Sequence, residues 1–188
     1  MTPSLVSLRG DALALLTSWP APTPAQEVLR ERYVEYLSGH DSGVFREDRP
    51  HHVTGSTLVM SADGASVLLT LHAKAHRWFQ FGGHLEPGDP SLLDAATREA
   101  REESGLHLAL DPVPVQLSDH EVPFCGGDTG VHHLDVRFLA VAPADAVHAV
   151  SEESLDVRWW PAEALPDPDP DLVELVALAR RRLDLGGR

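Results

Sequence analysis

Cysteine, basic residues and long apolar runs are all scarce in this chain of 188 residues. The single cysteine, Cys125, excludes an intrachain disulfide and a cysteine-rich zinc site, and it fits a reducing compartment. Lysine and arginine number 15 against 29 acidic residues, and the formal net charge of −14 argues against tight binding to a nucleic-acid polymer. Any phosphate group that the protein handles is therefore expected to arrive with a cation.

Membrane insertion and secretion are not expected either. No apolar run approaches the roughly 20 residues that a membrane-spanning helix needs. The run from Ala12 to Leu16 is short, Asp11 precedes it, and Arg9 is the only basic residue before it, which argues against a signal peptide. We therefore expect a cytoplasmic protein with no membrane partner.

The order of predicted elements indicates an α/β fold. Residues 1–50 are predicted to form an N-terminal helical extension, and residues 51–188 a second unit in which strands surround one central helix. Strands around a helix, with helices at both ends, favour one α/β sandwich with a mixed sheet covered on both faces. The helices are expected at 8–19, 26–38, 90–104 and 171–183, and β-like runs at 55–60, 65–72, 106–110, 113–124, 132–143 and 155–160.

The central helix has clear end signals in the stretch "GGHLEPGDPSLLDAATREAREESGL". Asp89 is the expected N-cap, Pro90 fits the first helical position, and Gly105 supplies a left-handed stop, so the helix should run from Pro90 to Ser104. At about 100° per residue, three carboxylates share one face of this helix. They belong to Glu99, Glu102 and Glu103.

These glutamates are predicted to lie among the small and apolar residues of the helix, and not opposite them. Carboxylates gathered at such a place repel one another unless protons or cations intervene, and a hard divalent cation is the obvious compensator. An ion-paired, solvated surface is the alternative, because Asp94, Arg98 and Glu102 alternate in sign at four-residue spacing. Gly82, Gly83 and Gly88 in the preceding loop allow close backbone approach to a metal or phosphate, but a tight turn could need them too.

The same stretch resembles the signature box of the Nudix hydrolases. Two departures are visible, because Asp89 stands where the box has glutamate, and eight residues, one more than usual, separate it from Arg98. The resemblance implies an α/β/α sandwich and hydrolysis of a nucleoside diphosphate linked to another moiety, with Mg²⁺ or Mn²⁺ as cofactor. Positions that match the box are Gly83, Arg98, Glu99, Ala100, Glu102, Glu103, Gly105 and Leu106.

Roles follow from this resemblance residue by residue. Glu99, Glu102 and Glu103 would be metal ligands, Gly83 would offer its carbonyl to the metal, and Arg98 would orient a glutamate by a charge-assisted hydrogen bond.

The general base is open, because family members use either a box glutamate or a later loop carboxylate. Glu99 is the first candidate, and Glu152 and Glu153 in "SEES" are the loop candidates, for which an ordinary acidic turn is the alternative. His84 and Glu86 are the expected substrate contacts.

Other histidines are weaker candidates. His132 and His133 are neighbours in a predicted strand and should point to opposite faces, so at most one of them is expected to face a pocket.

A nucleotide or sugar-nucleotide sensor of the same fold, which binds without hydrolysis, is the alternative function, although the full set of metal glutamates argues against it. The nucleotide-like substrate and the oligomeric state are not determined by the sequence, and a homodimer in which residues 1–50 exchange between subunits is one arrangement that the helical arm allows.

Overall fold

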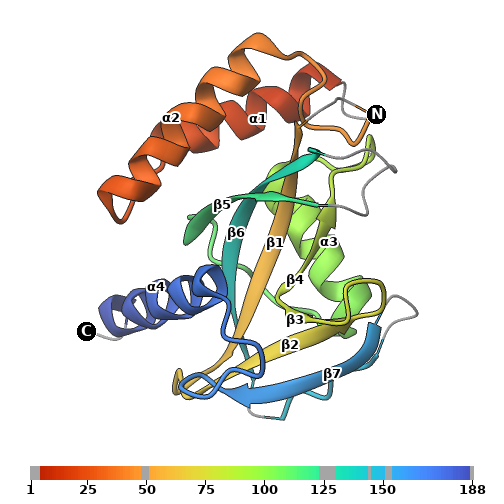
Figure 1. Ribbon diagram of the computed structural model, residues 1–188, viewed down its shortest axis with the longest axis vertical. Coiled ribbons are helices and arrows are strands. Elements are labelled where there is room, and N and C mark those ends of the chain that lie inside the picture. Colours follow the sequence, from red (N-terminus) through yellow and green to blue (C-terminus); the bar gives the residue numbers. More distant parts are fainter. Residues whose placement is uncertain (1–4, 48–50, 123–129, 144, 151–153, 187–188) are drawn as a thin grey trace.

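The computed structural model describes residues 5–47, 51–122, 130–143, 145–150 and 154–186 (Figure 1). Two N-terminal helices precede the sheet, one helix lies between its strands in the chain, and one follows them. The helices are α1 (Leu5–Ser18), α2 (Pro24–Gly39), α3 (Leu92–Ser104) and α4 (Pro170–Gly186). The strands are β1 (His51–Ser61), β2 (Ser66–His72), β3 (Trp78–Phe79), β4 (Phe81–His84), β5 (Gln116–Glu121), β6 (His132–Ala142) and β7 (Ser154–Pro161).

These strands form one mixed sheet in the order β3-β2-β1-β6-β5, with β4 paired to β1 and β7 paired to β2. The central pair, β1 and β6, is parallel along its whole length, from His51 beside His132 to Ser61 beside Ala142. The remaining strand pairs are antiparallel. The predicted mixed α/β sheet is therefore confirmed.

Helices cover both faces of the sheet, with α3 on one side and α4 on the other (Figure 1). Strand alternation divides the apolar side chains between them: Leu58 and Met60 of β1 pack with α4, whereas Val59 packs with Ala100 of α3. Gly55 of β1 lets α3 come close, because a Cβ there would lie 3.3 Å from the Cβ of Ala96. The sandwich inferred from the sequence is thus confirmed.

The N-terminal helices pack into the same core as the sheet. Leu8, Leu16 and Tyr33 are buried in one cluster with Val53 of β1 and Phe138 of β6. The two predicted N-terminal helices are present, and Thr23 caps α2 by accepting a hydrogen bond from the backbone N–H of Gln26. The division into residues 1–50 and 51–188 stays a prediction, but apolar packing joins the two parts.

A hydrogen-bond clamp also joins α2 to the outer strand β5. The buried side chain of Gln26 donates from Nε2 to the carbonyl of Leu117 at 3.1 Å and accepts from the Leu117 N–H at 2.6 Å. An edge strand has unpaired backbone groups that invite unwanted pairing. This one amide side chain satisfies both groups of Leu117.

Three predictions about local structure are wrong. Gly82 and Gly83 lie in strand β4 and not in a loop. The run 106–110 is not a strand, because only Leu110 forms an isolated bridge, to Ala140. Helix α3 begins at Leu92 and not at Pro90, because Ser91 is its N-cap and Asp89 bonds elsewhere. Within the described ranges, no helix is long and apolar enough to cross a membrane.

Candidate functional site

Helix α3 places a carboxylate directly against the backbone of strand β4. A Cβ added to Gly83 would lie 2.7 Å from Cδ and Oε1 of Glu99, closer than such atoms approach, so only glycine leaves room for that carboxylate. The predicted apolar face of the helix is correct, because Leu92, Ala95 and Ala96 are buried. Gly105 ends the helix in the left-handed conformation with φ of 72°, as expected.

Arg98 ties the loop before the helix to the helix itself. Its Nε and Nη2 donate to the two oxygens of Asp89 at 3.0 Å each, and Nη2 also donates to the backbone carbonyl of His84 at 2.9 Å. Its Nη1 donates to Glu99 Oε1 at 2.8 Å and to Glu102 Oε2 at 3.2 Å. The hydrogen bonds to Asp89 are the main reason that the pKa of Arg98 is raised, so this side chain holds its charge.

The three glutamates differ in their exposure. Glu103 is buried and accepts a hydrogen bond from the Gly82 N–H at 2.8 Å, whereas Glu99 is partly buried and half of the Glu102 side chain is exposed. The prediction that all three lie among the small and apolar residues of the helix is wrong for Glu102, whose side chain is half exposed. Arg98 bridges Glu99 and Glu102, so a cation would require these carboxylates to turn towards a common point.

The other predicted residues divide into two groups. His84 and Glu86 both line the large cleft beside α3, with His84 partly buried and Glu86 exposed. Glu152 and Glu153 lie outside the described residues. His132 and His133 both line the cleft, so the expectation that at most one faces a pocket is wrong: His132 bonds Asp119 at 2.6 Å, and His133 lies among other histidines.

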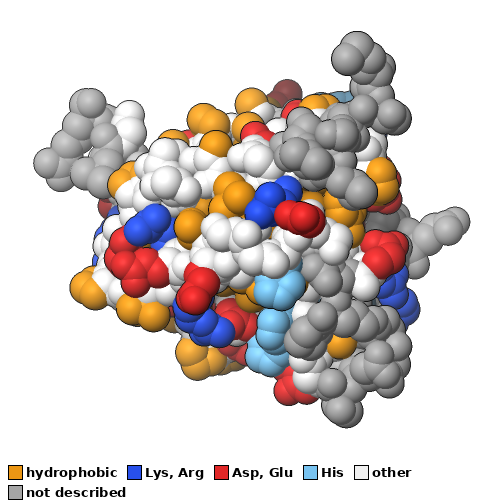
Figure 2. Space-filling view, turned by 90° about the horizontal axis from the view of Figure 1, so that it is seen from above, with side chains coloured by type: hydrophobic (Ala, Val, Ile, Leu, Met, Phe, Trp, Pro, Cys, Tyr) orange, Lys and Arg blue, Asp and Glu red, His pale blue; other side chains and the backbone are white. Residues whose placement is uncertain are grey.

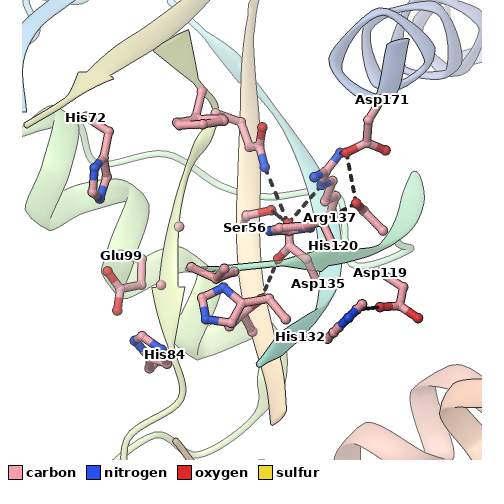
Figure 3. Close-up of a pocket in the computed structure, with 18 of the residues that line it drawn as sticks. Ser56, His72, His84, Glu99, Asp119, His120, His132, Asp135, Arg137 and Asp171 are labelled. Carbon is pink, nitrogen blue, oxygen red and sulfur yellow. Dashed lines mark hydrogen bonds and ion pairs between the residues drawn. The ribbon is translucent and has the colours of Figure 1, made fainter. Parts of the chain in front are cut away.

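The cleft has a volume of about 1570 Å³ and a polar floor that sequence reasoning missed. Figure 3 shows Glu99 and His84 on one side of it, with Asp135, Arg137 and His120 across from them. Acidic and basic side chains are interspersed on the face in Figure 2, where histidine side chains also lie next to one another. This hollow is large enough for a nucleotide-sized ligand.

At the centre of the floor is a buried ion pair. Arg137 Nε donates to Asp135 Oδ2 at 2.8 Å, and Arg137 Nη1 contacts Asp171 Oδ2 of α4 at 2.7 Å. The hydroxyls of Thr54 and Ser56 donate to the two Asp135 oxygens at 3.0 and 2.8 Å. Burial alone would raise the pKa of Asp135, but Arg137, His120 and the Ser56 hydroxyl hold it below its usual value, so the pair stays charged.

Strand alternation could have revealed this floor. Polar residues occupy every second position at the start of both strands. On β1 they are His52, Thr54 and Ser56, and on β6 they are His133, Asp135 and Arg137. The parallel register places these two polar rows side by side. Reading each strand alone hides the pattern, because only their pairing shows that the rows share one face.

Comparison with known proteins identifies the family. A family model described as the NUDIX domain matches residues 50–179, which is more than half of the chain. The chain therefore belongs to the Nudix family.

Its relatives carry names of nucleotide hydrolases. The chain is 30% identical over 131 residues to the human protein named 8-oxo-dGDP phosphatase NUDT18, and 30% identical over 139 residues to the human m7GpppN-mRNA hydrolase NUDT17. These alignments cover 64% and 66% of this chain but only 36% and 40% of the relatives. The chain thus spans well under half the length of the curated relatives that it matches.

A solved structure supports the same fold. The crystal structure of a NUDIX family hydrolase from Clostridium perfringens superimposes with a TM-score of 0.53 at 24% identity, covering 71% of this chain and 97% of the other. At this identity the likeness concerns the fold alone. It agrees with the mixed sheet and the helices on its two faces.

Proposed function

We propose that this protein hydrolyses the diphosphate linkage of a nucleoside diphosphate joined to another moiety, with Mg²⁺ or Mn²⁺ as cofactor. The observation that carries the proposal is a pair of α3 carboxylates held against strand β4 at the side of a polar cleft: Glu99 lies at Gly83, and Glu103 accepts a hydrogen bond from the Gly82 N–H. The names of the two human relatives, which refer to nucleotide derivatives, support a nucleotide-like substrate.

The donor set suits a hard divalent cation. Carboxylate and carbonyl oxygens are the ligands that Mg²⁺ prefers, and Glu99, Glu102, Glu103 and the carbonyl of Gly83 would hold it. When bound, such an ion neutralises phosphate charge and lowers the pKa of a water ligand. The missing side chain at Gly83 supports this assignment, because any Cβ there would displace Glu99.

Arg98 is a positioning residue in this proposal. Its bidentate contact with buried Asp89 fixes the guanidinium, and the fixed guanidinium then holds Glu99 and Glu102. Asp89 replaces the glutamate of the family box, and its anchoring of Arg98 gives the shorter side chain a physical role. We expect the extra residue of this box to be absorbed at the start of the helix, between Asp89 and Leu92.

The reaction is attack of a water oxygen on phosphorus. The new P–O bond forms as the bond to the bridging oxygen breaks, and that oxygen leaves with the other half of the substrate. Glu99 is our first candidate to accept the proton of the water, and Glu152 and Glu153 remain the loop candidates.

His84 and Glu86 remain predicted substrate contacts at the cleft. We also retain a cytoplasmic location and a homodimer as predictions, the latter tested by light scattering of the intact chain.

The decisive experiment measures product release from a panel of nucleoside-diphosphate compounds by ion-exchange chromatography, with Mg²⁺, with Mn²⁺ and with chelator. Release should depend on the metal and fall by orders of magnitude in Glu102→Gln and Glu103→Gln. Glu163→Gln is the matched control, because Glu163 is exposed and pairs with Arg180 on the surface. Full activity in both box variants would refute the proposal, and saturable binding without release would favour a sensor.

A further inference from the structure

Three histidines from three neighbouring strands meet in the cleft. They are His52 of β1, His84 of β4 and His133 of β6, and each offers a ring nitrogen within 4.8 Å of the other two. Their ring centres form an almost equilateral triangle, with separations of 4.8 Å between His52 and His133, 5.0 Å between His84 and His133, and 5.1 Å between His52 and His84. Among the described residues, no other trio of histidine or acidic side chains is brought together as closely.

Sheet register holds this triangle in place. His52 lies directly beside His133 in the parallel pair β1 and β6, and His84 pairs with Thr54, two positions further along β1 on the same face. The three rings are therefore carried by paired strand residues at one end of the sheet and not by a loop. Such support is what a preorganised ligand set requires.

The triangle has the size that a metal ion needs. With a Zn–N distance of about 2.0 Å and a ring radius of about 1.2 Å, three imidazoles around a tetrahedral ion have centres roughly 5 Å apart. The observed separations agree with this value. Ligand nitrogens around the ion would lie about 3.3 Å apart, whereas those of the triangle lie within 4.8 Å of one another, so rotation of the rings would have to bring them together.

The chemical state of the rings also suits a metal. Burial, followed by the neighbouring histidines, lowers the pKa of His84 to about 4 and that of His133 to about 3, so both rings are neutral near pH 7. A metal ligand must be the neutral imidazole. Nε2 of His133 is buried without a hydrogen-bond partner in the described part of the chain, and binding to a cation is one way to satisfy such an atom.

We propose that His52, His84 and His133 form a second metal site, which binds an ion of the Zn²⁺ class through three imidazole nitrogens. Imidazole ligands favour Zn²⁺, Co²⁺, Ni²⁺ or Cu²⁺, whereas Mg²⁺ prefers the carboxylates of α3, so the two sites select different ions. Three protein ligands leave a fourth position open, as in catalytic rather than structural zinc sites. Since His84 and His133 line the cleft, this position faces it, and His84 then contributes to substrate binding through the ion.

The test uses Co²⁺ as a spectroscopic probe of the intact chain after removal of metals by chelator and dialysis. One equivalent of Co²⁺ should give the intense visible bands of a four- or five-coordinate ion, and one equivalent of Zn²⁺ should abolish them. His133→Ala and His84→Ala should weaken binding more than about 100-fold, since even loss of an outer partner costs 10–100-fold. Thermal unfolding followed by circular dichroism identifies a variant that fails to fold. If one of the two histidine variants fails, the Co²⁺ bands of the other one test the proposal.

Two controls separate this site from the proposed catalytic one. His107→Ala removes an exposed histidine after α3, and Glu102→Gln removes a carboxylate, and both should keep the Co²⁺ bands. Absence of the bands in the wild-type protein, or bands unchanged in both His133→Ala and His84→Ala, would overturn the proposal. Bands lost in Glu102→Gln would also overturn it, by assigning the ion to α3. The readout is metal binding, so its outcome is independent of whether hydrolysis is found.

Discussion

Gly83→Ala offers the sharpest test of how α3 and β4 build the proposed catalytic site. The new methyl group would lie 2.7 Å from Cδ and Oε1 of Glu99 and 2.8 Å from Oε2, whereas ordinary contact begins at 3.4 Å. The carboxylate must therefore retreat by roughly 0.7 Å or turn away. Because a misplacement of about 1 Å can lower turnover about 100-fold, we expect a loss of that order.

The fold should survive this change. Gly83 does not have a left-handed φ, and the atoms that the methyl group would meet belong to the terminal carboxylate of one side chain and not to the backbone, so the free energy of unfolding should change by less than about 1 kcal/mol. Gly88→Ala is the matched control, because a Cβ there meets nothing within 4 Å. The assays are kcat on the best panel substrate and Mn²⁺ affinity by calorimetry. Wild-type values of both in Gly83→Ala would refute the reasoning.

Three further predictions concern stability. Arg98→Ala should lower the free energy of unfolding by about 3–5 kcal/mol, because it leaves the buried carboxylate of Asp89 without its ion partner. Urea titration measures this loss, and adding Asp89→Asn to the variant should restore part of it. Gln26→Leu should lower the free energy of unfolding by about 2–4 kcal/mol in the same assay, because the N–H and carbonyl of Leu117 lose their hydrogen-bond partners. A change below about 0.5 kcal/mol would contradict the proposed role of Gln26. With metals removed by chelator, the free energy of unfolding should fall as the pH drops from 7 to 5. In the folded chain the pKa is about 4 for His84 and about 3 for His133, below the ordinary value for histidine. The unfolded chain therefore binds more protons than the folded chain over this range, which favours unfolding. The loss is on the order of 2 kcal/mol for each ring, and an unfolding midpoint that does not move between these pH values would contradict it.

Much of the fold could be predicted because its signals are local. The periodic spacing of apolar residues and the positions of turn residues indicated the helices and most of the strands, and Gly105 correctly marked the end of α3. The start of that helix was wrong because Asp89 and Ser91 are both good N-caps. Arg98, nine residues away from Asp89, decides between them by taking up the Asp89 carboxylate, and such a partner is visible only in the folded chain.

The run 106–110 shows the opposite failure. Its leucines alternate as in a strand, but Leu106 and Leu108 pack against the α3 side of the core without a strand beside them. Alternation predicts two faces of different polarity, but it does not supply a neighbouring strand with free hydrogen-bonding groups. Only Leu110 finds such a partner, in Ala140.

The histidine triangle could not be predicted from spacing along the chain, because its members are separated by 32 and 49 positions. The available signal was a repetition: both β1 and β6 begin with two histidines, followed by polar residues at every second position. That repetition becomes a site only when the two strands lie parallel and in register, with His52 beside His133. A shift of one residue would place His52 beside His132 or Leu134 and would remove the triangle. The same register aligns Thr54 with Asp135, so the proposed metal site and the polar floor of the cleft depend on one pairing of strands.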